Sequence, residues 1–264
     1  MHEFTYHRPK DLKAAVALLR EAEDSKLLAG GMTLLPTMKQ RLAAPSDVID
    51  LAGIPELKGI RVEGGELVIG AMTCHADVAA SRAVKDAIPA LASLAEGIGD
   101  PAVRHCGTIG GSVANADPAA DYPAGVLALD AVIETTQRRI AADDFFVELF
   151  ETALEPAEIV TAVRFRIPDS ARYLKFPHPA SGYAVVGVFA ARFGPTVRVA
   201  VTGAGPSAFR VPEMEEALAR DFSPEAIAAV RISPGTLMGD IHCSAEYRAH
   251  VIAVLAQRAV SALR

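Results

Sequence analysis

The chain has 264 residues, of which 51% are hydrophobic, and 26 Lys and Arg against 32 Asp and Glu give it a formal net charge of −6. This length suits one large domain or two modest ones, and we expect two. The basic residues are scattered, which disfavours nucleic acid as a partner. No stretch of about twenty residues lacks charges and turn formers, so we expect no transmembrane segment. The N-terminus has no apolar core or small-residue cleavage site, which predicts a location in the cytoplasm.

Only three cysteines are present, Cys74, Cys106 and Cys243. They are too few and too dispersed for a disulfide framework or a zinc site. An iron-sulfur cluster normally needs about four cysteine thiolates. Any cluster with which this protein works is therefore expected on a partner chain, and no metal site is predicted here.

Helices and strands alternate in the first part of the chain. The predicted elements are a helix over residues 11–23, a strand over 26–29, a glycine turn at 30–31, a helix over 33–42, a strand over 48–51, a hairpin over 60–69 and helices over 75–98. The first helix rests on the helical spacing of Leu12, Val16 and Leu19. The hairpin rests on Gly64-Gly65 between alternating residues.

Helices and strands continue to alternate in the remainder of the chain. The predicted elements are a glycine-rich loop over 107–118, a helix over 119–129, strands over 130–135, 158–167, 183–192 and 197–201, and helices over 211–220, 224–230 and 244–263. Acidic residues between 143 and 151 are expected on a solvated helix face. The stretch 168–179 contains three prolines and is expected to be a connector, which places the domain boundary there.

Two glycine pairs are candidates for ligand contact: Gly30-Gly31 in LLAGGMTLLP and Gly110-Gly111 in GTIGGSVANADPAAD. Glycines at a turn allow positive φ and close approach of a ligand, and the free N–H groups can bind phosphate oxygens. The alternative is that each pair is only a tight turn. Neither motif fits the GxGxxG fingerprint, so a Rossmann domain is not expected.

Polar residues follow the second pair. Thr108 and Ser112 offer hydroxyls, Asn115 an amide, and Asp117 and Asp121 carboxylates. Carboxylates are repelled by a pyrophosphate, so their place would be beside a sugar-like chain. Asp117 precedes a proline and could instead cap the following helix.

These motifs carry a resemblance to a known family. LLAGGMTLLPTMKQRL and GTIGGSVANADPAADYPA resemble, in this order, the two FAD pyrophosphate loops of the molybdenum hydroxylase flavin subunits, a family that includes the medium subunit of aerobic carbon monoxide dehydrogenase and the flavin domain of xanthine dehydrogenase. KFPHPASGYAVVGV resembles the start of the family's C-terminal domain. The resemblance implies an α+β fold: a vanillyl-alcohol-oxidase (PCMH) type FAD-binding domain over 1–172, with subdomains of about 1–55 and 56–172, and a smaller α+β domain over 173–264.

The resemblance also implies which residues contact FAD. Two sets would hold the pyrophosphate from opposite sides: Ala29, Gly30, Gly31, Met32 and Thr33, and Thr108, Ile109, Gly110, Gly111 and Ser112. Others would lie beside the ribityl or ribose, the flavin ring or an apolar part of the cofactor: Ala114, Asn115, Asp117, Asp121, Val160 and Tyr183. A basic position near the flavin matches either Lys175 or His178. The family often has AGGHS in the first loop, where this chain has Met32 and Thr33, so the contact from the histidine is missing.

The implied function is that of an oxidoreductase subunit. FAD would pass electrons from the iron-sulfur clusters of a small subunit to an external acceptor, with the molybdenum cofactor on a large subunit and the complex a dimer of heterotrimers. No catalytic residue is expected on this chain, and aldehydes, purines, N-heterocycles and carbon monoxide all stay open as substrates of the complex. Two alternatives are a free-standing FAD oxidoreductase and an assembly module without cofactor. His75, His105 and His242 lack metal-ligand spacing and are expected to be surface or satisfied core residues.

Overall fold

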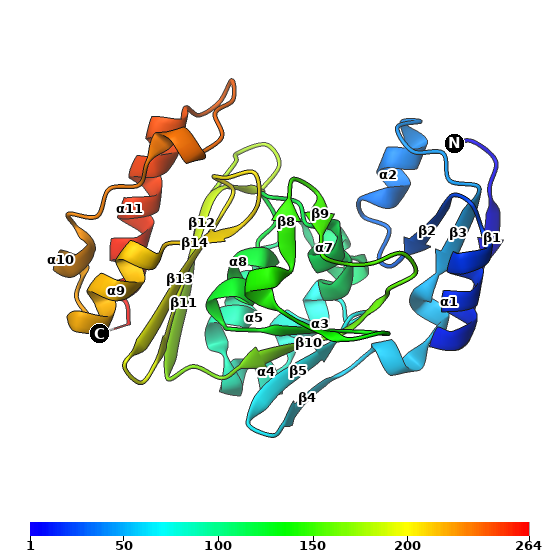
Figure 1. Ribbon diagram of the computed structural model, residues 1–264, viewed down its shortest axis with the longest axis horizontal. Helices are drawn as coiled ribbons and strands as arrows, with labels where there is room; N and C mark the ends of the chain where they lie inside the picture. The colour runs from blue at the N-terminus through cyan, green and yellow to red at the C-terminus, as the bar shows by residue number, and fades with distance from the viewer. Residues whose placement is uncertain (264) are drawn as a thin grey trace.

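The computed structural model describes residues 1–263, and Arg264, the last residue of the predicted C-terminal domain, lies outside the described residues. Figure 1 shows three lobes in a row, each built from a continuous part of the chain: an N-terminal lobe (1–57), a central lobe (58–169) and a C-terminal lobe (170–263). Each lobe combines strands with helices, which confirms the predicted α+β class.

The N-terminal lobe is built on a parallel three-stranded sheet in which β3 lies between β1 and β2. Its elements are β1 (Thr5–His7), α1 (Leu12–Glu21), β2 (Ser25–Leu28), α2 (Leu34–Lys39), β3 (Asp47–Asp50) and the short 3-10 turns η1 (Leu51–Gly53) and η2 (Pro55–Leu57). The Asp11 side chain caps α1 by accepting the Ala14 N–H at 2.8 Å. The predicted strand, glycine turn and helix are therefore present as β2, a turn at Gly31 with φ of 72°, and α2.

The central lobe contains a five-stranded antiparallel sheet in the order β4-β5-β10-β6-β7. Its strands are β4 (Ile60–Glu63), β5 (Glu66–Gly70), β6 (Val132–Thr135), β7 (Arg139–Ala141) and β10 (Val160–Arg166), and its helices are α3 (His75–Ala80), α4 (Arg82–Ala87), α5 (Pro89–Glu96), α6 (Pro101–Cys106), α7 (Ile109–Asn115) and α8 (Tyr122–Ala128). Gly64 and Gly65 both have positive φ between β4 and β5, as the predicted hairpin requires.

Two local expectations for the central lobe are wrong. Most of the expected glycine-rich loop is helix α7, which Thr108 caps by accepting the Gly111 N–H at 3.1 Å. The acidic stretch forms the turn η3 (Ala142–Asp144) and the small hairpin of β8 (Phe146–Glu148) and β9 (Glu151–Thr152) instead of a helix face. Asp143 is also not simply solvated, because it pairs with Arg198 at 2.6 Å and Arg210 at 2.9 Å.

The C-terminal lobe contains the antiparallel sheet β11-β12-β13-β14. Its elements are β11 (Ser170–Pro177), β12 (Ala184–Phe193), β13 (Thr196–Thr202), β14 (Phe209–Arg210), α9 (Pro212–Arg220), α10 (Pro224–Ile227), η4 (Pro234–Thr236) and α11 (Ala245–Ser261). The expected connector is therefore a strand, since its prolines lie before β11, at its last residue and after it. The predicted domain boundary at 172/173 falls inside β11, and the division into domains stays a prediction.

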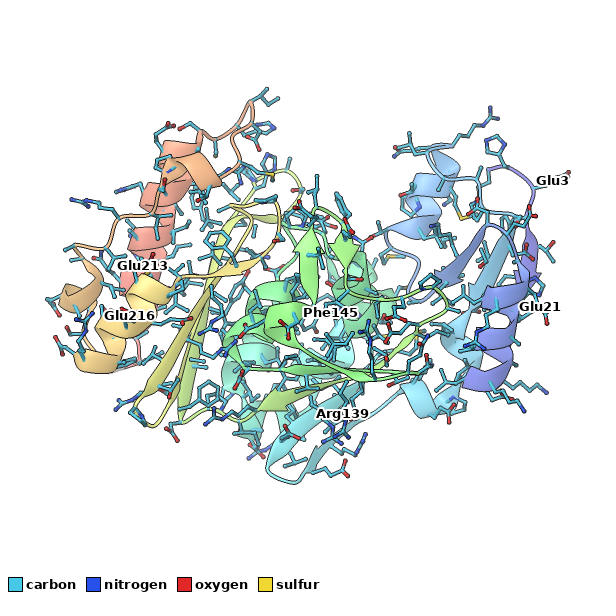
Figure 2. All side chains as sticks on the ribbon, in the orientation of Figure 1. Glu3, Glu21, Arg139, Phe145, Glu213 and Glu216 are labelled. Carbon is cyan, nitrogen blue, oxygen red and sulfur yellow. The ribbon has the colours of Figure 1, made fainter. Side chains whose placement is uncertain are left out.

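Both faces of this C-terminal sheet are buried. On one face, Phe189 and Ala191 of β12 join the core of the central lobe. On the other face, Val188 and Ala190 pack with the core that includes α9 and α11. Because alternate residues of a strand point to opposite sides, one strand joins two cores. Figure 2 accordingly shows Glu213 and Glu216 of α9 at the outer edge of the molecule.

Candidate functional site

A cavity of about 930 Å³ lies where the three lobes meet. The N-terminal lobe contributes the turn after β2, the central lobe contributes α7 and the end of β5, and the C-terminal lobe contributes residues 180–183 of the turn before β12. The volume is at the upper end of the range of about 300–1,000 Å³ for small-molecule sites. A large ligand is therefore expected.

The first glycine pair lies against the segment that precedes the second. A Cβ atom on Gly30 would come within 2.6 Å of the Cys106 carbonyl carbon and of the Gly107 Cα, and closer still to the Cys106 carbonyl oxygen. Gly30 and Met32 make no hydrogen bond to any residue within 1–263. Their N–H groups at the cavity wall are therefore available to a ligand.

The N–H groups of the second glycine pair have partners within the protein. Gly110 and Gly111 have helical backbone without positive φ. A Cβ on Gly110 would come within 2.7 Å of the Ala71 carbonyl oxygen, which accepts the Gly110 N–H at 2.8 Å. The Ile109 N–H similarly donates to the Thr73 carbonyl oxygen at 3.1 Å. These N–H groups hold α7 against the end of β5 and are not free for phosphate.

The two aspartates are held in different ways. Asp117 accepts the Ala119 N–H at 2.9 Å, so it closes a turn and does not cap α8. Burial raises the pKa of Asp117. Asp121 is buried, accepts the Tyr173 hydroxyl at 2.5 Å, and lies 3.0 Å from the Lys175 ammonium. Burial raises the pKa of Asp121, and the nearby Lys175 charge opposes that change.

The structure brings most of the predicted site residues to the cavity wall. Those that line it are Ala29, Gly30, Gly31, Met32, Thr33, Thr108, Gly110, Gly111, Ser112, Ala114, Asn115, Asp117, Asp121, Val160 and Tyr183. Three do not. Ile109 is a fully buried core residue, Lys175 reaches the site only through Asp121, and the His178 ring packs on His242 at 4.7 Å between centroids. The His178 N–H donates to the Tyr183 carbonyl oxygen at 2.7 Å, so His178 belongs to the turn that carries Tyr183.

The sequence analysis missed other parts of the wall. These residues are Lys26, Leu27, Leu34, Thr37, Leu51, Ala71, Met72, His75, Ile98, Gly99, Asp100, Val103, Gly107, Ala120, Phe150, Ile159, Ala180, Ser181 and Gly182. Several of these residues lie next to a predicted motif in the sequence, so they could have been predicted from that position. Phe150 gives no such signal, because it reaches the cavity from the β8–β9 hairpin. It also has positive φ of 57°, a conformation that is uncommon for an aromatic residue.

The histidines divide between surface and interior. His105 and His242 are exposed, as expected, whereas His75 is buried at the cavity wall with a ring nitrogen that has no partner within residues 1–263. Its expected description as a surface or satisfied core residue is therefore wrong. Among residues 1–263, no cluster of three or more His, Cys, Asp or Glu could hold a metal ion. None of the helices in that same range is long and apolar enough to cross a membrane.

Comparison with known proteins identifies the class to which this fold and cavity belong. The family described as "FAD binding domain in molybdopterin dehydrogenase" matches residues 2–169, so the chain belongs to that family. The protein is thus an FAD-binding medium subunit of the molybdenum hydroxylase type and a component of an oxidoreductase. The fold expected from the resemblance is confirmed.

The particular relatives are medium chains of multi-subunit enzymes. The carbon monoxide dehydrogenase medium chain of Hydrogenophaga pseudoflava is 38% identical over 98% of this chain and 96% of its own. The nicotine 6-hydroxylase medium subunit of Paenarthrobacter nicotinovorans is 38% identical over 97% and 95%. A solved structure of reconstituted carbon monoxide dehydrogenase from Oligotropha carboxidovorans matches with a TM-score of 0.91 and 34% identity, covering 99% of this chain and 97% of that one.

The cavity fits the cofactor of this family. The free N–H groups of Gly30 and Met32 at its wall suit phosphate oxygens. Hydroxyls of Thr33 and Ser112 line the same wall. The wall therefore offers neutral hydrogen-bond donors together with the carboxylates of Asp117 and Asp121, which suits a pyrophosphate joined to a polyol.

Proposed function

We propose that this chain passes electrons from the iron-sulfur clusters of a small partner subunit to an external acceptor, within a complex whose large subunit carries the molybdenum cofactor. FAD supplies the redox chemistry, since it accepts electrons singly and releases them singly or in pairs. A dimer of heterotrimers is the proposed assembly. A location in the cytoplasm stays a prediction of the sequence.

The observation that carries this proposal is the cysteine inventory. Cys74, Cys106 and Cys243 are all free, and they are fewer than the four thiolates or so that a cluster needs. A chain of the molybdenum hydroxylase type that holds FAD and no cluster must receive its electrons from another chain. The multi-subunit relatives support the same division of labour.

The proposed roles of the residues follow from their positions. The N–H groups of Gly30 and Met32 would bind the pyrophosphate, with Ser112 and Asn115 reaching it or the adjoining sugar from α7. Asp121 would accept from a cofactor hydroxyl at the wall. It is held in place there by Tyr173 and Lys175.

Tyr183 is proposed to cover the flavin ring from the C-terminal lobe. It is 46% exposed although it lines the cavity. Burial of part of the ring, together with the charges of Asp117 and Asp121, raises the pKa of its hydroxyl, so Tyr183 stays neutral at physiological pH. An aromatic ring of this kind can pack on the flavin and exclude water from one face.

An absorbance spectrum and a subunit analysis of the natively purified protein test the proposal. Flavin bands, together with two copurifying chains that carry iron-sulfur clusters and molybdenum, are the expected result. A yellow protein that purifies alone and oxidises a small molecule unaided would show the free-standing oxidoreductase instead. A colourless protein that rejects added FAD would contradict cofactor binding itself.

A variant separates electron delivery from hydroxylation. A Cβ on Gly111 would come within 2.9 Å of the Thr108 Oγ1 and 3.3 Å of the Ala29 Cβ, so Gly111→Val should close the cavity between the two motifs. We expect the assembled complex to lose flavin absorbance and turnover with the natural acceptor. Hydroxylation with an artificial acceptor that bypasses flavin should persist. Its loss in an intact complex would refute the proposed division of labour.

A further inference from the structure

The side chain of His75 is a buried polar group at the wall of the FAD cavity. His75 is the first residue of α3, directly after the segment that joins this helix to β5. Only 5% of the residue is exposed, and it lines the cavity. It reaches the same wall as Gly107 and Thr108, which lie just before α7.

The imidazole has no hydrogen-bond partner within residues 1–263. Its Nδ1 atom is fully enclosed without a partner, and no hydrogen bond to Nε2 is present in that range. The hydroxyl of Tyr122, whose ring centroid lies 5.3 Å from that of His75, is enclosed without a partner as well. Buried polar groups are nearly always hydrogen-bonded, so two neighbouring exceptions beside a cavity call for an explanation.

The charge state of His75 determines which hydrogen bonds its ring nitrogens can make. Burial, assisted by the positive charge of Arg104, lowers the pKa of His75 to about 4. The ring is therefore neutral at physiological pH, with a proton on one nitrogen and a lone pair on the other.

The geometry makes Nε2 the nitrogen that can offer a proton to a ligand in the cavity. Nδ1 is enclosed by protein and has no partner within residues 1–263, so it does not face the cavity. The edge with Nε2 lies against Gly107 of the cavity wall, where an added Cβ would come within 2.6 Å of Nε2. Gly107 has no positive φ that would require glycine. Its lack of a side chain leaves the Nε2 edge open toward the cavity.

We propose that His75 is a further cofactor-binding residue, whose Nε2–H donates a hydrogen bond to an oxygen acceptor of bound FAD. The acceptor belongs to the pyrophosphate or the ribityl chain, because His75 lies at the glycine motif. This inference rests on FAD binding by the chain and not on the direction of electron flow.

The test measures FAD affinity of the full-length chain after removal and re-addition of flavin. We expect His75→Leu to weaken FAD binding by about ten- to hundredfold, as for loss of a hydrogen bond to a charged or strongly polar acceptor. The FAD-free His75→Leu protein should melt at a higher temperature than wild type, because a buried polar group without a partner has been removed. His250→Leu, the same change at an exposed position of α11, should alter neither property.

Two amide variants identify the nitrogen. The amide of Gln reaches the position of Nε2 and that of Asn the position of Nδ1, so His75→Gln should restore most of the affinity and His75→Asn should not. Riboflavin, which lacks the phosphates, identifies the acceptor: a loss confined to FAD indicates phosphate, and a loss for both ligands indicates the ribityl chain.

Several results would overturn the inference. His75→Leu could bind FAD as tightly as wild type, or it could lower FAD affinity and the melting temperature of the FAD-free protein together, as a purely structural residue would. Equal rescue by Gln and Asn would contradict the assignment to Nε2. If wild type itself failed to bind FAD, both this inference and the proposed function would fail. If wild type and His75→Leu both bound FAD normally, this inference would fail and the proposed function would stand.

Discussion

Substitution of Gly30 by alanine should separate the two motifs that enclose the cofactor cavity. The added Cβ would come within 2.6 Å of the Cys106 carbonyl carbon and the Gly107 Cα. Carbon atoms in contact prefer about 3.5–4.0 Å, so the N-terminal lobe must move away from the central lobe by about 1 Å. Overpacking of this kind typically costs about 1–3 kcal/mol.

The added Cβ should destabilise the FAD complex more than the FAD-free protein. Without FAD, the two lobes can relieve the clash by opening slightly, whereas bound FAD would need both motifs at their native separation. The dissociation constant of FAD, measured by flavin fluorescence titration, should therefore rise by about five- to hundredfold, with a smaller loss of stability in the FAD-free protein.

Gly235→Ala provides the matched control, because Gly235 has no positive φ and its added Cβ would meet only the Ser233 Oγ at 3.7 Å. It should leave FAD affinity unchanged. Native affinity in Gly30→Ala, or an equal loss in Gly235→Ala, would refute the reasoning.

Two further predictions concern pH dependence and stability. Burial raises the folded-state pKa of Asp117 above its ordinary value of 3.8, so its contribution to stability is fully present below that value and is lost as pH rises through the folded pKa. Asp117→Asn should remove this dependence. In urea unfolding from pH 3.5 to 7, the free energy of unfolding of the variant should therefore increase relative to that of wild type as pH rises. A difference between the two proteins that stays constant with pH would contradict the prediction. Arg198 is buried and pairs with Asp130 at 2.8 Å and Asp143 at 2.6 Å. Arg198→Met should cost about 1–3 kcal/mol in urea unfolding, because the Leu127 carbonyl oxygen loses its buried donor and two half-exposed carboxylates lose a charged partner. Arg82→Met, at a side chain 88% exposed, should cost less than about 1 kcal/mol; similar losses for the two variants would show that burial does not matter here.

Elements with strong local signals were predicted correctly. Helix α1 and the β4–β5 hairpin each rest on periodicity within a few residues and on a cap or turn that lies next to them in the sequence. The same holds for the glycine turn at Gly31, where positive φ is a local property of the backbone. These features depend little on distant parts of the chain.

Helix α7 and strand β11 were missed because tertiary contacts outweigh the local signal. Gly110 and Gly111 disfavour a helix by propensity, yet the Thr108 cap and the hydrogen bond from Gly110 to Ala71 fix α7. Prolines around β11 predicted a connector, but they lie at or beyond the ends of the strand, where a missing N–H costs little. The pairing with β12 decides the outcome there.

The sequence by itself determined that the chain belongs to an FAD-binding family and carries too few cysteines for a cluster, because both conclusions depend on residue identity and spacing. Only the tertiary structure decided which groups face the cofactor. It turned the Ile109 and Gly110 N–H groups inward to the end of β5, placed Lys175 behind Asp121, and left His75 enclosed at the cavity wall without a partner. Such assignments depend on contacts between segments far apart in the chain, for which a single sequence contains no periodic signal.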